Sequence, residues 1–225
     1  MATSKTPPRL KLAVLISGEG SNLQAILDAC ASGALSAEVC TVVSNRADAR
    51  GLRRGMAAGV PIHTILATGG TTREDYDAAL RIVIERHAPH LILLAGFMRI
   101  LSDGFVRHFR GRLLNVHPAL LPKHRGLHTH RRALAAGERE HGCSVHFVTE
   151  ELDGGPVIAQ AKVAVKANDT EQTLAARVRQ REHVLYPLVV RWFAEDRMRL
   201  GANHVLFDGQ PLSAPRVFGI NEEIA

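Results

Sequence analysis

The chain has 225 residues, of which 46% are hydrophobic and 22% are charged. This composition is that of an ordinary globular protein and excludes a disordered chain, a collagen and a coiled coil. The longest apolar run, residues 91–98, is far shorter than the about 20 residues that a membrane span requires. The formal net charge of +6 suits anionic partners. Because there is no run of five or more basic residues, small anionic substrates fit better than nucleic acid.

Cysteine usage indicates a reducing compartment. The chain has three cysteines, an odd number with no CxxC pair, at Cys30, Cys40 and Cys143. This argues against a disulfide framework and against a thiolate zinc site. The N-terminal apolar stretch, residues 12–16, reads as a strand and not as a signal peptide. We therefore expect a cytoplasmic location and no contact with a membrane.

From residue 10 onwards, apolar runs alternate with amphipathic stretches, which is typical of a parallel sheet flanked by helices. Strands are expected at 10–17, 38–44, 62–65, 90–95 and 112–116. Helices are expected at 21–31, 47–58, 72–87 and 102–108. A later pair of strands, 144–149 and 157–165, encloses a tight polar turn. The pattern predicts a doubly wound α/β fold whose sheet is mostly parallel and becomes mixed in the C-terminal half.

Two further segments follow the late pair of strands. A long helix is expected at about 170–195, and the segment from Gly201 shows short strand and turn signals without a second core. Residues 1–9, which include Pro7 and Pro8, are expected to form a mobile extension. We therefore expect residues 10–225 to form a single domain.

The first expected strand ends in a glycine-rich turn, and a helix follows at once. Backbone N–H groups and the positive end of the helix dipole then face the crevice above the sheet, which predicts an anion site at Gly20, Ser21 and Asn22. A dinucleotide fingerprint would need glycine at position 23, where the chain has Leu23, and no Walker lysine follows. A single sugar phosphate therefore fits better than NAD or ATP. The alternative is a plain turn in which Ser21 or Asn22 caps the helix.

Asn115 and His117 lie two residues apart at the end of the fifth expected strand, so their side chains share one face. Open α/β sheets bind ligands at the carboxyl ends of their strands. A carboxamide donor beside an imidazole suits the stabilisation of a developing oxyanion. The alternative is that Asn115 caps a turn and that His117 fills a half-buried position.

Asp153 lies in the turn between the two late strands, and a turn at a strand end can reach back over the crevice. A carboxylate close to His117 would favour the protonated imidazole and orient the ring, which makes the histidine an acid usable near neutrality. The alternative is a local turn cap, the usual role of a turn aspartate. By itself, the apolar segment 98–101 reads as a buried connection between a strand and a helix.

Six of the twelve histidines fall within residues 117–146, and the pair His128 and His130 raises the question of a metal site. The cluster lacks an HExxH motif and a carboxylate partner at helical spacing. Histidines and arginines in a loop also suit anionic ligands. We therefore predict no metal site. The glycine and arginine content of the loop 120–130 is compatible with a mobile lid.

Together these segments resemble the folate-dependent phosphoribosylglycinamide formyltransferases of purine synthesis. The resemblance runs from residue 10 to about 210 and includes VLISGEGSNLQAILDAC, GRLLNVHPALLPKHRGLHTHRRAL and HGCSVHFVTEELDGGPVIAQAKV. It implies a Rossmann-like formyltransferase fold with a nucleotide-binding half at 10–110, a folate and catalytic half at 111–200 and a tail at 201–225. It also implies formyl transfer from 10-formyltetrahydrofolate to the amine of 5'-phosphoribosylglycinamide.

The resemblance implies roles for single residues as well. Asn115 and His117 would stabilise the oxyanion, His117 would donate a proton, and Asp153 would help to move the amine proton. Binding of the ribonucleotide is implied for Gly20, Ser21, Asn22 and Glu182. Binding of the folate is implied for Arg73, Met98, Arg99, Ile100, Leu101 and Asn115. No metal is implied, and the expected partners are these small molecules, with the chain as a monomer or homodimer.

Four residues depart from the family's pattern. Glu19 places a negative charge between the glycines of the phosphate turn. His124 and Arg125 stand where an aromatic residue and a proline or lysine are usual, and Arg179 replaces a polar residue upstream of Glu182. None of the four belongs to the expected catalytic group.

Three other functions compete with the transferase. Formyltetrahydrofolate hydrolase would use water in place of the amine, but that family carries an added N-terminal domain. Methionyl-tRNA formyltransferase carries an added C-terminal domain that binds nucleic acid. A non-catalytic sugar-phosphate or RNA-binding module would explain the charge and the glycine turn, but it would leave Asn115, His117 and Asp153 without a role.

Overall fold

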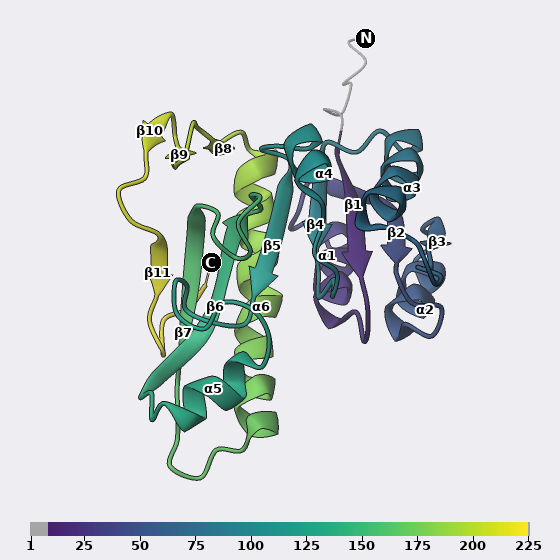
Figure 1. The fold of residues 1–225 in the computed structure, drawn as a ribbon. Helices are drawn as coiled ribbons and strands as arrows, with labels where there is room; N and C mark the ends of the chain where they lie inside the picture. The colour runs from purple at the N-terminus through teal and green to yellow at the C-terminus, as the bar shows by residue number, and fades with distance from the viewer. Residues whose placement is uncertain (1–8, 225) are drawn as a thin grey trace.

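The computed structural model describes residues 9–224, so the expected extension at residues 1–9 lies outside the described residues except for its last one. An eight-stranded sheet in the order β11-β7-β6-β5-β4-β1-β2-β3 forms its centre (Figure 1). Its strands are β1 (Leu10–Ile16), β2 (Ala37–Ser44), β3 (Ile62–Thr64), β4 (Leu91–Leu94), β5 (Leu113–His117), β6 (Glu140–Phe147), β7 (Val157–Ala164) and β11 (Arg216–Phe218). Every neighbouring pair is parallel except the two pairs that β6 makes with β5 and β7. The predicted fold, mostly parallel and mixed on the C-terminal side, is confirmed.

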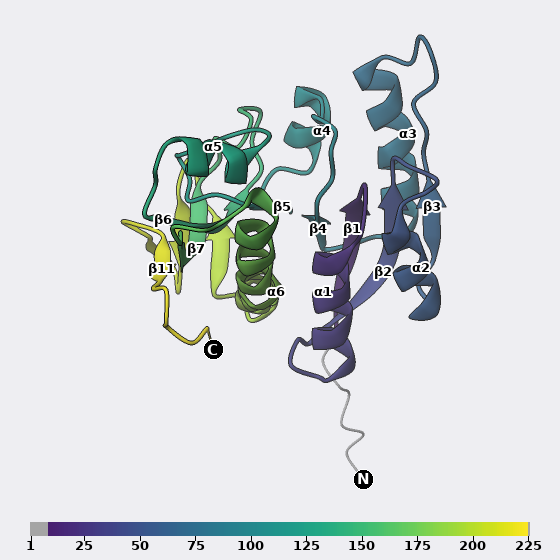
Figure 2. The same cartoon turned by 90° about the horizontal axis from the view of Figure 1, so that it is seen from below.

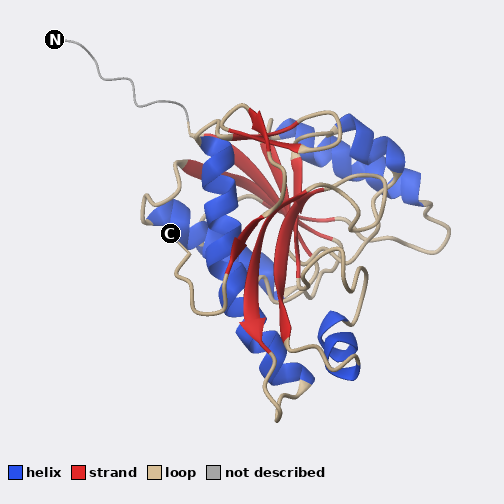
Figure 3. Ribbon diagram, turned by 90° about the vertical axis from the view of Figure 1, so that its left-hand side faces the viewer, coloured by secondary structure: helices blue, strands red, loops and turns tan. Residues whose placement is uncertain are grey.

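Helices cover both faces of this sheet (Figure 3). They are α1 (Ser21–Ala31), α2 (Arg50–Ala57), α3 (Arg73–Arg86), α4 (Asp103–His108), α5 (Thr129–Ala135) and α6 (Glu171–Ala194). The second helix begins three residues later than expected, at Arg50. α5 was not expected, and the strand expected from residue 144 begins earlier, at Glu140.

The two faces can be followed along β1, whose side chains alternate between two apolar clusters, as the period of a strand requires. Leu12, Val14 and Ile16 pack with residues of α1 and α6. Ala13 and Leu15 pack with residues of α3 and α4 on the opposite face. All five side chains are fully buried, so β1 forms the centre of both halves of the core.

The longest helix, α6, begins with a capping box in which the side chains and backbone of Thr170 and Thr173 are paired. It lies beside α1 on one face of the sheet (Figure 2). The buried Tyr186 hydroxyl lies 3.2 Å from the carbonyl oxygen of Leu94 and 3.0 Å from that of Leu114. These contacts tie α6 to β4 and β5, the two strands that lead into the site.

The C-terminal segment forms a small antiparallel sheet of β8 (Met198–Leu200), β9 (Val205–Phe207) and β10 (Gln210–Pro211). The ring of Phe207 meets that of Trp192 edge-on, with 5.1 Å between the centroids. The chain then returns to the main sheet as β11, parallel to β7. The tail therefore packs on the existing core. Within residues 9–224, no helix combines the length and the apolar character needed to cross a bilayer.

Candidate active site

A cavity of about 540 Å³ opens where β1 and β5 end, at the edge of the sheet towards which their arrowheads point in Figure 1. Its walls come from the start of α1, the segment after β4, the end of β5, the loop before α5, the turn before β7 and α6. The predicted site residues that line it are Asn22, Met98, Arg99, Ile100, Asn115, His117, Asp153 and Glu182. The fold thus brings together residues that are up to 160 positions apart.

The glycine-rich turn leaves the start of α1 without a side-chain cap. Gly20 is the N-cap residue with φ +69°, and no acidic residue occupies the first helical turn. The alternative in which Ser21 or Asn22 caps the helix is therefore wrong. A Cβ at Gly20 would lie 2.5 Å from the Cα of Gly51, so only glycine fits. The carboxylate of Glu19, 62% exposed, pairs with Arg50 at 3.2 Å and does not enter the site.

Asn22 and Glu182 join the start of α1, after the glycine-rich turn, to α6. The Asn22 amide donates to Glu182 Oε2 at 2.8 Å, and both side chains are buried. Burial raises the pKa of Glu182, while the bond from Asn22 and the charge of Arg179 oppose that rise. The pair places an acceptor-rich carboxylate on the cavity wall close to the free N–H groups of α1.

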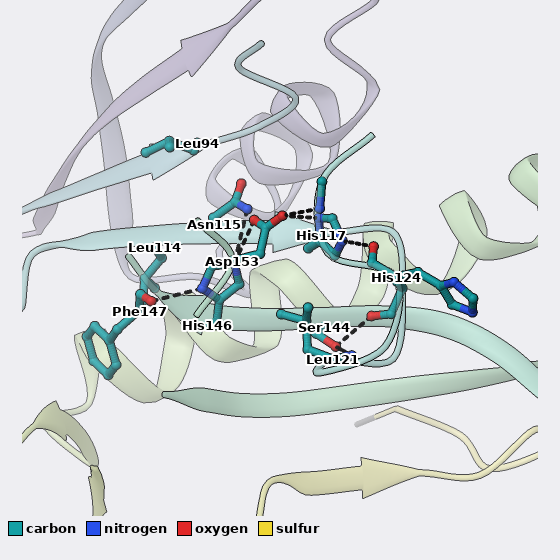
Figure 4. Close-up of polar contacts among 12 residues, drawn as sticks. Leu94, Leu114, Asn115, His117, Leu121, His124, Ser144, His146, Phe147 and Asp153 are labelled. Atoms are coloured by element: carbon teal, nitrogen blue, oxygen red, sulfur yellow. Dashed lines mark hydrogen bonds and ion pairs between the residues drawn. The ribbon is translucent and has the colours of Figure 1, made fainter. Parts of the chain in front are cut away.

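Asn115 is held by a histidine on the neighbouring strand (Figure 4). His146 Nδ1 lies 2.9 Å from the Phe147 carbonyl oxygen, so this nitrogen carries the hydrogen, because a carbonyl only accepts. His146 Nε2 then accepts from the Asn115 amide at 3.1 Å. Burial lowers the pKa of His146 to about 4, in agreement with a neutral ring. The second N–H of the Asn115 amide remains for a ligand in the cavity.

The turn before β7 brings Asp153 to His117. Asp153 Oδ2 lies 3.4 Å from His117 Nδ1, and both side chains are almost completely buried. The other ring nitrogen, Nε2, lies 3.0 Å from the carbonyl oxygen of His124. The His124 carbonyl only accepts, so Nε2 carries a hydrogen, and the Asp153 carboxylate faces the other ring nitrogen. The backbone N–H of Gly126 donates to the same Asp153 oxygen at 2.8 Å.

The segment after β4 forms the apolar side of the site. The backbone N–H of Met98 donates to Ser17 Oγ at 2.7 Å, which anchors the segment to the end of β1. The Met98 and Ile100 side chains are 64% and 54% exposed. The guanidinium of Arg99 lies 4.0 Å from the centre of the Tyr76 ring. Exposed apolar side chains at a cavity mouth suit a flat, partly apolar ligand.

A narrower space of about 90 Å³ adjoins the cavity, and its lining includes Leu101 together with Asn115 and His146. Of the predicted residues, Gly20 and Ser21 belong to the glycine-rich turn beside the cavity but do not line it. Arg73 is exposed at the start of α3 and lines neither space. Its role in folate binding stays a prediction.

The sequence pattern did not reveal the side chains that support β5. In the antiparallel register Asn115 faces His146, and His117 faces Ser144. The buried hydroxyl of Ser144 donates to the Ala119 carbonyl at 2.6 Å and accepts from the Leu121 N–H at 3.0 Å, so it holds the loop that follows His117. Among residues 9–224, no group of three or more His, Cys, Asp or Glu side chains is arranged to hold a metal ion.

Comparison with known proteins identifies the family. A family profile described as formyl transferase matches residues 10–190. The chain belongs to the formyl transferase family. The phosphoribosylglycinamide formyltransferase of Escherichia coli (strain K12) is 56% identical over 203 residues, which cover 90% of this chain and 96% of that protein. A solved phosphoribosylglycinamide formyltransferase from Coxiella burnetii is 49% identical, with a TM-score of 0.89, and the match covers 93% of this chain and 99% of that one.

These relatives confirm the prediction that the chain is a formyltransferase similar to the phosphoribosylglycinamide formyltransferases. A solved formyltetrahydrofolate deformylase from Pseudomonas putida KT2440 has the same overall fold, with a TM-score of 0.81 over 90% of this chain and 72% of that one. Its sequence identity is only 26%. The water-using alternative is therefore the more distant relative.

Proposed function

We propose that this chain transfers the formyl group of 10-formyltetrahydrofolate to the amine of 5'-phosphoribosylglycinamide in de novo purine biosynthesis, giving formylglycinamide ribonucleotide and tetrahydrofolate. The observation that carries the proposal is the group of Asn115, His117 and Asp153 in one cavity, between an uncapped helix start and an apolar segment. The two relatives named for this reaction support it.

The cavity offers one wall for each substrate. The free N–H groups at the start of α1, with the positive end of its dipole, suit the phosphate of the ribonucleotide. The Glu182 carboxylate, oriented by Asn22, accepts hydrogen bonds from ribose hydroxyls. The segment from Met98 to Leu101 and the adjoining narrow space bind the pterin of the folate.

The catalytic group lies between these walls, where the amine meets the formyl carbon. As the amine nitrogen attacks, the carbonyl oxygen becomes an oxyanion, which the free N–H of Asn115 and the Nδ1–H of His117 stabilise, because His117 Nε2 is already bonded to the His124 carbonyl. His117 gives a proton to the leaving folate nitrogen as the carbon–nitrogen bond breaks. Asp153 takes up the proton that the amine loses, so one proton is removed and one is delivered.

The proposal includes a cytoplasmic location and a monomer or homodimer, both expected from the sequence. Cell fractionation and light scattering test these two points independently of the reaction. Binding of nucleic acid forms no part of the proposal.

The test is to incubate the purified protein with 5'-phosphoribosylglycinamide and 10-formyltetrahydrofolate and to search for the formylated nucleotide by mass spectrometry. We expect product that requires the ribonucleotide and that the His117→Ala variant forms far more slowly. Formate and tetrahydrofolate appearing at the same rate without the ribonucleotide would establish the hydrolase instead. A lack of any reaction, together with RNA binding that falls steeply with salt, would favour the binding module.

A further inference from the structure

The three-residue segment from His124 to Gly126 contacts both members of the His117 and Asp153 pair. The His124 carbonyl accepts from His117 Nε2 at 3.0 Å, and the Gly126 N–H donates to Asp153 Oδ2 at 2.8 Å. These are backbone groups, so their positions depend on the path of the loop and not on the identity of its side chains. A contact that fixes the position of this segment therefore also orients His117 and Asp153.

The side chain of the middle residue, Arg125, leaves the loop and forms an ion pair with Glu151. Glu151 lies two residues before Asp153, and its carbonyl accepts from the Gly154 N–H at 3.0 Å within the same tight turn. The carbonyl of Arg125 in turn accepts from the Arg132 guanidinium on α5. Arg125 thus connects the turn that carries Asp153, the loop and the helix beyond it.

The backbone of this region needs such support. His124 has φ +56° and Asp153 has φ +48°. Non-glycine residues adopt this left-handed region at a conformational cost, and they stay there only when the surroundings hold them. The loop that contains His124 and the turn that contains Asp153 meet where the Gly126 N–H donates to Asp153. The partly exposed Arg125–Glu151 pair links the same two segments a second time.

We propose that Arg125 and Glu151 are positioning residues for formyl transfer, which hold the loop against the turn so that the His124 and Gly126 backbone groups orient His117 and Asp153. Neither residue touches the reacting atoms in this assignment. The test of this assignment by kcat rests on the proposed function.

The size of the effect follows from exposure, because the two side chains are 40% and 65% exposed. Ion pairs at that exposure are weak and are screened by salt. We therefore expect Arg125→Gln and Glu151→Gln each to lower kcat about two- to fivefold at low ionic strength. The double variant should lose no more than the single variants, because both remove the same contact. Added salt should lower the wild-type kcat to the level of the variants.

Charge reversal sharpens the test. Arg125→Glu places two carboxylates side by side and should lower kcat more than Arg125→Gln does, and the exchange Arg125→Glu with Glu151→Arg should restore most of the loss. The matched control is Glu140→Gln, which breaks the exposed 2.7 Å pair with Lys162 on β6 and β7. That variant should keep the wild-type kcat and its salt dependence.

Hydrogen exchange gives a readout that needs no substrate. Removal of the Arg125–Glu151 pair should speed exchange of the Gly126 amide about two- to fivefold at low salt, while amides of β1 stay unchanged. Wild-type kcat and wild-type Gly126 exchange in both single variants would overturn the assignment, as would failure of the exchanged pair to recover. An inactive wild type with faster Gly126 exchange in the variants would refute the proposed function and leave the positioning contact standing.

Discussion

Acidification from pH 8 to pH 5 is expected to destabilise the folded protein by about 4 kcal/mol through His141 and His146 together. Their side chains are only 1% and 2% exposed. Burial lowers the pKa of each ring from 6.5 to about 4. The unfolded chain therefore takes up a proton on each ring near pH 6.5, whereas the folded chain stays neutral until about pH 4. The stability that these rings contribute is complete above pH 6.5 and is lost as the pH falls towards 4.

The magnitude follows from those two pKa values. At pH 5 an unfolded histidine is almost fully protonated and the buried ring is not, which favours unfolding by about 2 kcal/mol for each residue. His130, whose Nδ1 lies 3.2 Å from His141 Nε2, also has a pKa lowered by burial and adds to the loss. Because domains are commonly stable by about 5–15 kcal/mol, the sum is a large share of the total.

The assay is urea unfolding at pH 8 and pH 5 at constant ionic strength, followed by the fluorescence of the buried Trp192. In His141→Gln, whose amide still pairs with His130 but does not titrate, the difference in unfolding free energy between the two pH values should shrink by about 2 kcal/mol. His204→Gln, at an exposed position, should keep the wild-type difference. Equal stability of the wild type at both pH values, or an undiminished difference in His141→Gln, would refute the reasoning.

Three substitutions test other parts of the argument. His117→Ala is expected to lower kcat about a hundredfold or more with little change in ribonucleotide affinity, and near-normal turnover would remove His117 from the mechanism. Glu182→Gln should raise the KM for the ribonucleotide about tenfold, because a charged acceptor is lost, and an equal rise in the KM for the folate would contradict its place on the ribose side. Gly51→Ala should lower the free energy of unfolding by about 1–3 kcal/mol, because the new Cβ would lie 2.5 Å from the Ile16 side chain. Gly69→Ala, with open space around it, is the control in the same urea titration.

Seven of the eight strands of the main sheet could be predicted because they are apolar runs, most of them separated by amphipathic helices, a pattern that depends only on local periods. The eighth, β11, is a three-residue strand and was not predicted. α5 could not be predicted in the same way. It has seven residues, Thr129–Ala135, with three basic side chains and two buried positions, Thr129 and Ala133. A helix this short has little stability of its own and forms because tertiary contacts hold it. Its sequence therefore reads as a polar loop.

Glu182 was predicted as a site residue only from the family resemblance. The sequence also carries a physical signal for its burial. It lies on the same stripe of α6 as Leu174, Val178, Leu185 and Val189, all of which are buried. A charged residue on an apolar stripe must find a polar partner when the helix packs. That pattern predicts a buried, paired carboxylate. It does not identify the partner, because Asn22 is 160 residues away and meets Glu182 only through the packing of α1 against α6.

His146 was missed because both faces of β6 are buried, so its pattern lacks the alternation of apolar and solvated positions that reveals a face. Cys143, Val145 and Phe147 pack into the apolar core. Ser144 and His146 point to the other face, where they bond the loop after β5 and the Asn115 amide. A polar residue buried on a strand costs free energy unless it is hydrogen-bonded. Polar side chains at alternate positions of an otherwise apolar strand therefore indicate that this strand supports polar groups of its neighbour, which here are the groups that we propose for formyl transfer.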